Sequence, residues 1–191
     1  MLGERFSHFL DKPLSPLARV LPFNPNFITF LGMIITASSA FLIPVSLFWG
    51  GLIILLGGVF DMLDGIIARV NGKVTRFGAL LDSTLDRIAD GLIFLGIALY
   101  FFKISDDLAL CFNLLCMIGS FLISYVRARA EGIGVSCKIG IIERPERLIF
   151  LAFGCLTELL YPVIIILTVL SWITVIQRII YVKKQLKDLP G

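Results

Sequence analysis

The chain has 191 residues, of which 58% are hydrophobic and only 16% are charged, and its formal net charge is +3. This composition argues against a water-soluble fold, because soluble domains carry far more charge. The long runs of Leu, Ile, Phe and Gly lack the alternation of transmembrane β-strands, so the composition predicts an all-α integral membrane protein. A stretch of roughly 20 apolar residues crosses the hydrocarbon core, and a chain of this length has room for about six such stretches.

The predicted elements follow one another closely along the chain. Residues 1–23 mix apolar and basic side chains and contain Pro13, Pro16 and Pro22, which indicates an amphipathic juxtamembrane segment. Hydropathy predicts six transmembrane helices after it, over residues 26–48, 50–71, 77–102, 107–131, 145–162 and 164–182. Residues 24–182 then form one six-helix bundle in a single domain, and residues 183–191 form a tail.

Lys and Arg residues are unevenly distributed among the predicted connections. They gather before the first span, in the second and fourth connections and after the last span, whereas the opposite loops contain only Lys103. The positive-inside rule therefore predicts that both termini and these basic connections are cytoplasmic, in a multi-pass protein of the cell membrane. Membrane topology explains the positive charge, and nucleic acid is not an expected partner.

Acidic side chains lie inside the second and third predicted spans, where a mid-span aspartate costs about 2.5 to 3.5 kcal/mol. Asp61 and Asp64 are three residues apart, and Asp82 and Asp86 are four apart, so each pair shares a helix face. The short connection between the two helices makes them antiparallel and brings the pairs together near the cytoplasmic surface. The four carboxylates repel one another unless a cation neutralises them.

Oxygen-only ligation favours Mg²⁺ or Mn²⁺, and two such ions about 3.5 to 4 Å apart suit phosphoryl displacement. Glycines near the carboxylates, including Gly57, Gly58, Gly65 and Gly78, permit close approach of a ligand or a helix. Arg69 lies one turn beyond Gly65, and its guanidinium can hold a phosphate beside the metal ions. The pattern predicts a site for a diphosphate.

Eight fixed residues over 26 positions resemble the signature of the CDP-alcohol phosphotransferase family: Asp61, Asp64, Gly65, Ala68, Arg69, Gly78, Asp82 and Asp86. The resemblance implies six transmembrane helices with an N-terminal juxtamembrane helix, usually in a homodimer. It also implies transfer of a phosphatidyl-type group from a CDP-activated lipid to an alcohol, with release of CMP.

The same resemblance assigns roles to individual residues. It implies that Asp61, Asp64 and Asp82 are metal ligands, while Asp86 completes the cluster and serves as the general base. The residues that it implies for binding of the CDP-lipid are Asn26, Thr29, Asp64, Gly65, Arg69, Thr75 and Gly78. Asn26 and Thr29 belong to a Pro-Asn-x-x-Thr start of the first span, which the ordinary preferences of helix N-termini also explain.

The fourth connection is rich in arginine and glutamate, in the segments Ser124-Tyr125-Val126-Arg127-Ala128-Arg129-Ala130-Glu131 and Glu143-Arg144-Pro145-Glu146-Arg147-Leu148. Together with Arg178, these arginines would surround the metal site with positive charge. The interleaved glutamates favour side chains that are ion-paired and oriented around a small phosphorylated acceptor. Contact with lipid phosphates under the positive-inside rule is the alternative explanation.

These segments and the late Gln177-Arg178 pair resemble the phosphatidylinositol phosphate synthases and their archaeal counterparts. The resemblance implies that myo-inositol phosphate is the acceptor and that Arg127, Arg129 and Arg178 bind its phosphate. Arg144, Arg147 and Glu143 are either further contacts or supports. Glycerol 3-phosphate or serine as acceptor, an intramembrane prenyltransferase and a cation transporter remain alternatives, and the lipid chains can be ester-linked or ether-linked.

Overall fold

The computed structural model describes residues 25–187, which form six α-helices and no strand. The helices are α2 (Pro25–Leu42), α3 (Leu47–Val70), α4 (Arg76–Lys103), α5 (Asp107–Gly132), α6 (Arg144–Leu156) and α7 (Leu160–Lys187). The predicted all-helical class is confirmed for this part of the chain. The predicted juxtamembrane segment 1–23 and the last residues of the tail, 188–191, lie outside the described residues.

Four of these helices, α2, α3, α5 and α7, are long and apolar enough to cross a membrane. The other two differ for reasons visible in the sequence. Helix α4 has 28 residues but carries Asp82, Asp86, Arg87 and Asp90 between its second turn and its middle, and α6 has only 13 residues. Length and apolar composition thus support four spans directly.

Prolines account for the main differences between the predicted and observed boundaries. The first predicted span, 26–48, is divided between α2 and α3, because Pro44 follows Leu42 closely and disfavours a helical conformation in the residue before it. The fifth predicted span, 145–162, ends early at Leu156. Glu158 has a φ of 60°, and α7 starts at Leu160 so that Pro162 falls in its first turn, where its missing N–H is tolerated.

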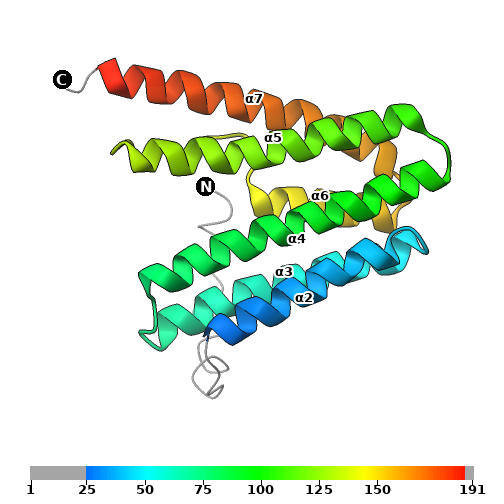
Figure 1. Ribbon diagram of the computed structural model, residues 1–191, viewed down its shortest axis with the longest axis horizontal. Helices are drawn as coiled ribbons and strands as arrows, with labels where there is room; N and C mark the ends of the chain where they lie inside the picture. The colour runs from blue at the N-terminus through cyan, green and yellow to red at the C-terminus, as the bar shows by residue number, and fades with distance from the viewer. Residues whose placement is uncertain (1–24, 188–191) are drawn as a thin grey trace.

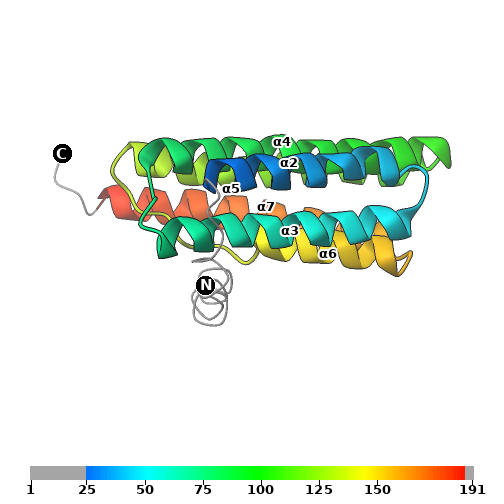
Figure 2. The same cartoon turned by 90° about the horizontal axis from the view of Figure 1, so that it is seen from below.

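The helices run side by side in two layers, with α2, α4 and α5 in one layer and α3, α6 and α7 in the other (Figure 1, Figure 2). Helix α2 packs against both α3 and α4, α5 packs on α7, and α6 packs on α3 and α7. The largest apolar core lies toward the end of the bundle that holds the α4–α5 connection, and it includes the fully buried side chains of Ile54, Ile97 and Ile164. The charged side chains of α3, α4 and α6 lie toward the opposite end, beside two smaller apolar clusters.

Small residues allow the closest helix approaches in this arrangement. A Cβ atom added to Gly96 of α4 would lie 2.7 Å from the Cα atom of Ala40 in α2, so the two backbones meet directly at this point. Helix α2 packs against both α3 and α4, whereas α3 and α4 make few direct contacts with each other. The position of α2 therefore fixes how far apart the acidic faces of α3 and α4 lie.

We expect Gly96→Ala to lower the melting temperature of the purified protein in detergent. The added methyl group would push α2 away from α4, and overpacking of this kind costs about 1–3 kcal/mol. Gly58→Ala is the matched control, because a Cβ atom at Gly58 meets nothing within 4 Å. Equal melting temperatures for the two variants would contradict the close contact between α2 and α4.

Candidate metal and phosphate-binding site

Three aspartates converge at the polar end of the bundle. Asp61 comes from α3, and Asp82 and Asp86 come from successive turns of α4. One carboxylate oxygen of each residue lies within 4.8 Å of the others. Such a group of oxygen atoms matches the ligands that Mg²⁺ and Mn²⁺ prefer. The sequence predicted this convergence from direct packing of α3 on α4, whereas the structure achieves it with α2 packed against both helices.

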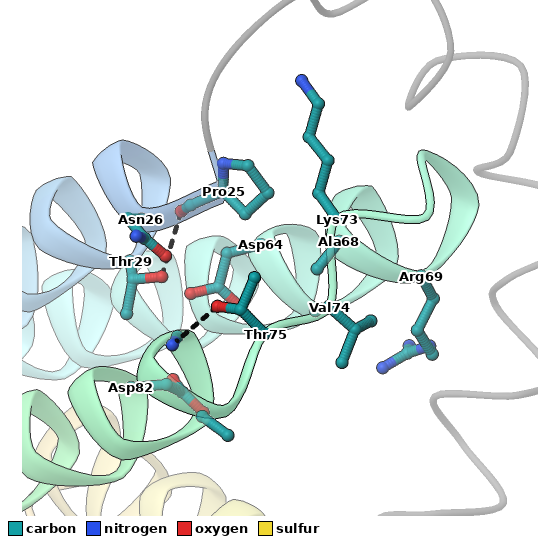
Figure 3. Close-up of a pocket in the computed structure, with 13 residues that line it drawn as sticks. Pro25, Asn26, Thr29, Asp64, Ala68, Arg69, Lys73, Val74, Thr75 and Asp82 are labelled. Atoms are coloured by element: carbon teal, nitrogen blue, oxygen red, sulfur yellow. Dashed lines mark hydrogen bonds between the residues drawn. The ribbon is translucent and has the colours of Figure 1, made fainter.

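Asp64, the fourth predicted metal ligand, lies beside this group rather than within it. Asp64 is 5% exposed, and its Oδ2 atom has no hydrogen-bond partner among the described residues. Thr29 of α2 lies against the carboxylate, and Asp82 lies across from it (Figure 3). A buried carboxylate oxygen without a donor is the kind of atom that a bound cation satisfies. The residues present therefore fit a divalent metal ion held between α3 and α4.

A cavity of about 320 Å³ opens beside Asp64 and Asp82 (Figure 3). It is formed by the first turn of α2, the last turns of α3 and the start of α4. Its lining includes all seven residues that the family resemblance implied for the CDP-lipid: Asn26, Thr29, Asp64, Gly65, Arg69, Thr75 and Gly78. Lys73 lines the same cavity, so two basic residues border it together with the carboxylates.

The start of α4 shapes one wall of this cavity. Thr75 caps the helix, and its side chain accepts a hydrogen bond of 2.9 Å from the backbone N–H of Gly78. A Cβ atom at Gly78 would lie 2.9 Å from the Thr75 hydroxyl oxygen and 3.3 Å from Asn26 Oδ1. Glycine at this position therefore keeps the cap and the neighbouring amide in place.

Arg144, at the start of α6, reaches into the acidic group. Its Nη1 atom lies 2.7 Å from Asp61 Oδ1 and 3.0 Å from Asp86 Oδ1, and its Nε atom lies 3.1 Å from Asp90 Oδ1. One guanidinium thus contacts three carboxylates from two helices. The sequence predicted Arg144 as a contact or support for an acceptor phosphate and did not predict its contacts with the aspartates.

A second cavity, of about 520 Å³, lies on the other side of Asp82. Four of the five arginines predicted for the acceptor line it: Arg127, Arg144, Arg147 and Arg178. Asp82 and Ala79 line both cavities, so the two spaces meet at the first turns of α4. The arrangement can hold two phosphate-bearing ligands, one on each side of the acidic group.

Arg129, the fifth predicted arginine, does not line this second cavity. It borders an apolar groove between α5 and α7, together with Ile133, Ile179 and Leu186. Two residues apart on an α-helix point about 200° apart, which directs Arg129 away from Arg127. The prediction that both side chains serve one ligand is therefore not supported by their placement.

Arg178 is held firmly by the surrounding backbone. It is 1% exposed, and it donates hydrogen bonds of 2.7 Å to the carbonyl oxygens of Ile139 and Ile123. Its Nη2 atom lies 3.4 Å from Glu143 Oε1. Arg178 thus ties α7 to α5 and to the connection before α6 while it also lines the second cavity.

Glu143 connects several parts of the second cavity. It is the N-cap of α6 and forms a capping box with Glu146. Its Oε1 atom also lies 3.9 Å from Arg127 Nη1. The carboxylate therefore links the start of α6 with arginines from α5 and α7.

Two charged residues near the site received no role from the sequence. Arg87 lines the second cavity, and its Nη1 atom lies 3.3 Å from Asp86 Oδ2. Asp90 is buried and contacts both Arg144 and Arg147. The signal that identified the other aspartates, charge inside a predicted span, also applies to these two residues.

The chain is similar to known proteins along almost its whole length. The model of the CDP-alcohol phosphatidyltransferase family matches residues 23–181. The archaetidylinositol phosphate synthase of Methanothermobacter thermautotrophicus is 38% identical, and the match covers 96% of this chain and 95% of that protein. The phosphatidylinositol phosphate synthase of Mycobacteroides abscessus is 41% identical, with 92% and 84% covered.

Solved structures of a related enzyme have the same fold. The phosphatidylinositol phosphate synthase of Mycobacterium tuberculosis with CDP-DAG bound is 38% identical, with a TM-score of 0.82 over 88% of this chain and 92% of that chain. The same enzyme in complex with manganese and citrate has a TM-score of 0.81 over 88% of each chain.

We expect Asp61→Asn to weaken binding of Mn²⁺ by about tenfold or more, because it removes one charged ligand from the acidic group. The affinity can be measured by electron paramagnetic resonance of free Mn²⁺ in titrations of the purified protein. Asp107→Asn is the matched control, since Asp107 is an exposed aspartate at the opposite end of the bundle. Equal affinities for the two variants would show that Asp61 is not a metal ligand.

Proposed function

The chain belongs to the CDP-alcohol phosphatidyltransferase family, and we propose that it transfers a phosphatidyl or archaetidyl group from a CDP-activated lipid to inositol phosphate, with release of CMP. The observation that carries this proposal is the pair of cavities that meet at Asp82. One has the residues of the family's CDP-binding signature, and the other has five arginines, four of which the sequence assigned to a phosphorylated acceptor.

We propose that two ions of Mg²⁺ or Mn²⁺ bind to four aspartates: Asp61, Asp64, Asp82 and Asp86. Two ions suit phosphoryl displacement. When bound, the metal neutralises charge on the diphosphate and on the oxygen atoms that attack and leave. The manganese in the related M. tuberculosis structure supports this assignment. Asn26, Thr29, Gly65, Arg69, Thr75 and Gly78 are proposed to bind the CDP part of the lipid, because they line one cavity beside Asp64.

Asp86 is the proposed general base. Its carboxylate belongs to the acidic group, and the residue also lines the second cavity. It accepts the proton of an inositol phosphate hydroxyl while that oxygen attacks the lipid-linked phosphorus of the diphosphate. A new phosphorus–oxygen bond forms to the acceptor, the bond to the CMP oxygen breaks, and CMP leaves. Arg127, Arg144, Arg147 and Arg178 orient the acceptor through its phosphate.

The placement in the membrane is part of the same proposal. We propose that α4 and α6 also cross the membrane, giving six spans, and that the protein is a homodimer. Among the described residues, Lys103 is the basic residue in or beside the α2–α3, α4–α5 and α6–α7 connections. Lys73, Arg76 and Lys138 lie in or beside the α3–α4 and α5–α6 connections, which are at the site's end of the bundle. The positive-inside rule supports a cytoplasmic location for the site and both termini.

Purified protein should convert CDP-diacylglycerol or its archaeal ether counterpart, with radiolabelled inositol phosphate and Mg²⁺ or Mn²⁺, to a lipid-soluble product and CMP. Asp86→Asn should lower turnover by about 100-fold or more, because it cannot accept the proton. Glycerol 3-phosphate and serine complete the acceptor panel. Label in lipid from either of these but not from inositol phosphate would reject the proposed acceptor. CMP release distinguishes the reaction from prenyl transfer and from cation transport.

Arg127→Ala should raise the KM for inositol phosphate by about 10- to 100-fold, which corresponds to loss of a charge-assisted hydrogen bond of about 1.5–3 kcal/mol. Arg129→Ala should leave this KM within about twofold of the original, because that side chain borders the groove between α5 and α7. Steady-state kinetics at saturating CDP-lipid measure both values. Equal increases for the two variants would contradict the placement of the acceptor in the second cavity.

A further inference from the structure

One buried carboxylate has no part in the proposed chemistry. Asp90 lies on α4 one turn beyond Asp86, and it is 4% exposed. It lines neither the CDP-side cavity nor the second cavity. A charged side chain buried among apolar helices is costly, and such residues are usually paired and functional. The partners of Asp90 therefore indicate its role.

Asp90 uses each carboxylate oxygen for a different arginine. Oδ1 lies 3.1 Å from Arg144 Nε, and Oδ2 lies 3.0 Å from Arg147 Nη2. The two arginines are three residues apart in the first turn of α6, so they lie on one face of that helix. A carboxylate shared in this way fixes both the separation and the direction of the two guanidinium groups.

The same carboxylate removes a repulsion that would otherwise separate the arginines. Two like charges at this spacing on a helix repel each other. Both side chains nevertheless line the second cavity, and the side chain of Arg147 is only 3% exposed. The negative charge of Asp90 lies between them from the neighbouring helix, so α4 supplies the charge that lets α6 present two arginines together.

We infer that Asp90 is a positioning residue for the acceptor phosphate, which acts through Arg144 and Arg147 and does not touch the substrate. This inference rests on the proposed function for the identity of the acceptor. Asp90 connects α4, which carries Asp82 and Asp86, to two arginines of the acceptor cavity. Loss of Asp90 should therefore impair acceptor binding more than binding of the CDP-lipid.

Asp90→Asn keeps the size of the side chain and removes its charge. We expect the KM for inositol phosphate to rise by about tenfold or more, while the KM for the CDP-lipid stays within about twofold. Asp90→Glu restores the charge and should give an acceptor KM between those of the original protein and Asp90→Asn. If Asp90→Asn does not fold, Asp90→Glu is compared directly with the original protein, and the same selective rise is expected.

Asn113→Ala is the matched control for loosened packing. Asn113 is fully buried, and its Nδ2 atom donates a hydrogen bond of 3.0 Å to the carbonyl oxygen of Phe94, which joins α5 to α4. This variant should lower the melting temperature without a selective change in the acceptor KM. Parallel changes in both KM values for the Asp90 variants, or an unchanged acceptor KM, would overturn the inference.

A binding measurement separates this inference from the proposed function. Inorganic phosphate should raise the melting temperature of the original protein and of Asn113→Ala, and Asp90→Asn should need about tenfold or more phosphate for the same rise. If phosphate behaves in this way but inositol phosphate yields no product, the proposed acceptor fails and the role of Asp90 stands. If Asp90→Asn responds to phosphate as the original protein does, the role of Asp90 fails.

Discussion

Negative charge buried among apolar helices needs positive charge within reach, and Arg144 supplies much of it at the polar end of this bundle. Its guanidinium contacts Asp61, Asp86 and Asp90, which come from two different helices. Asp90 is buried, whereas the side chains of Asp61 and Asp86 are 30% and 15% exposed, so Arg144 offsets the cost of a buried unpaired charge chiefly at Asp90. The planar guanidinium has five donors in a fixed fork and can serve several carboxylates at once, which a compact lysine ammonium cannot do in the same way.

The start of α6 follows from this requirement. The connection before it, residues 133–143, enters the bundle, where Val135, Cys137 and Ile142 are buried. Non-helical backbone that is buried in the protein must find its hydrogen-bond partners there. Helix α7 provides two of them, because Arg178 donates to the carbonyl oxygen of Ile139 and Thr174 Oγ1 accepts from the N–H of Ile142. The first residue of α6, Arg144, is thereby placed against the aspartates of α3 and α4.

The sequence predicts the parts of this structure that depend on local pattern. Apolar runs mark the helices, and the spacing of Asp82 and Asp86 places both on one face of α4. It does not predict that Asp64 lies beside the group of Asp61, Asp82 and Asp86 rather than within it, or that Arg144 enters that group. Those features depend on where α2 packs and how deep α6 begins, and both are set by contacts between distant segments. Helix geometry predicts that Arg127 and Arg129 point to different sides of α5. It does not predict that one lines the second cavity and the other the groove between α5 and α7.

The two cavities differ in the source of their positive charge, and this difference suits the proposed reaction. The CDP side has Arg69 and Lys73 with carboxylates that suit a divalent ion, whereas the second cavity has arginines held by Asp90 and Glu143. An acceptor phosphate bound by anchored guanidinium groups need not share the metal with the diphosphate. Because Asp82 borders both spaces, two anionic substrates can approach each other there while each keeps its own balancing charge. On the acceptor side, the repulsion between the substrates is thus offset by arginines that Asp90 and Glu143 hold in place before a substrate binds.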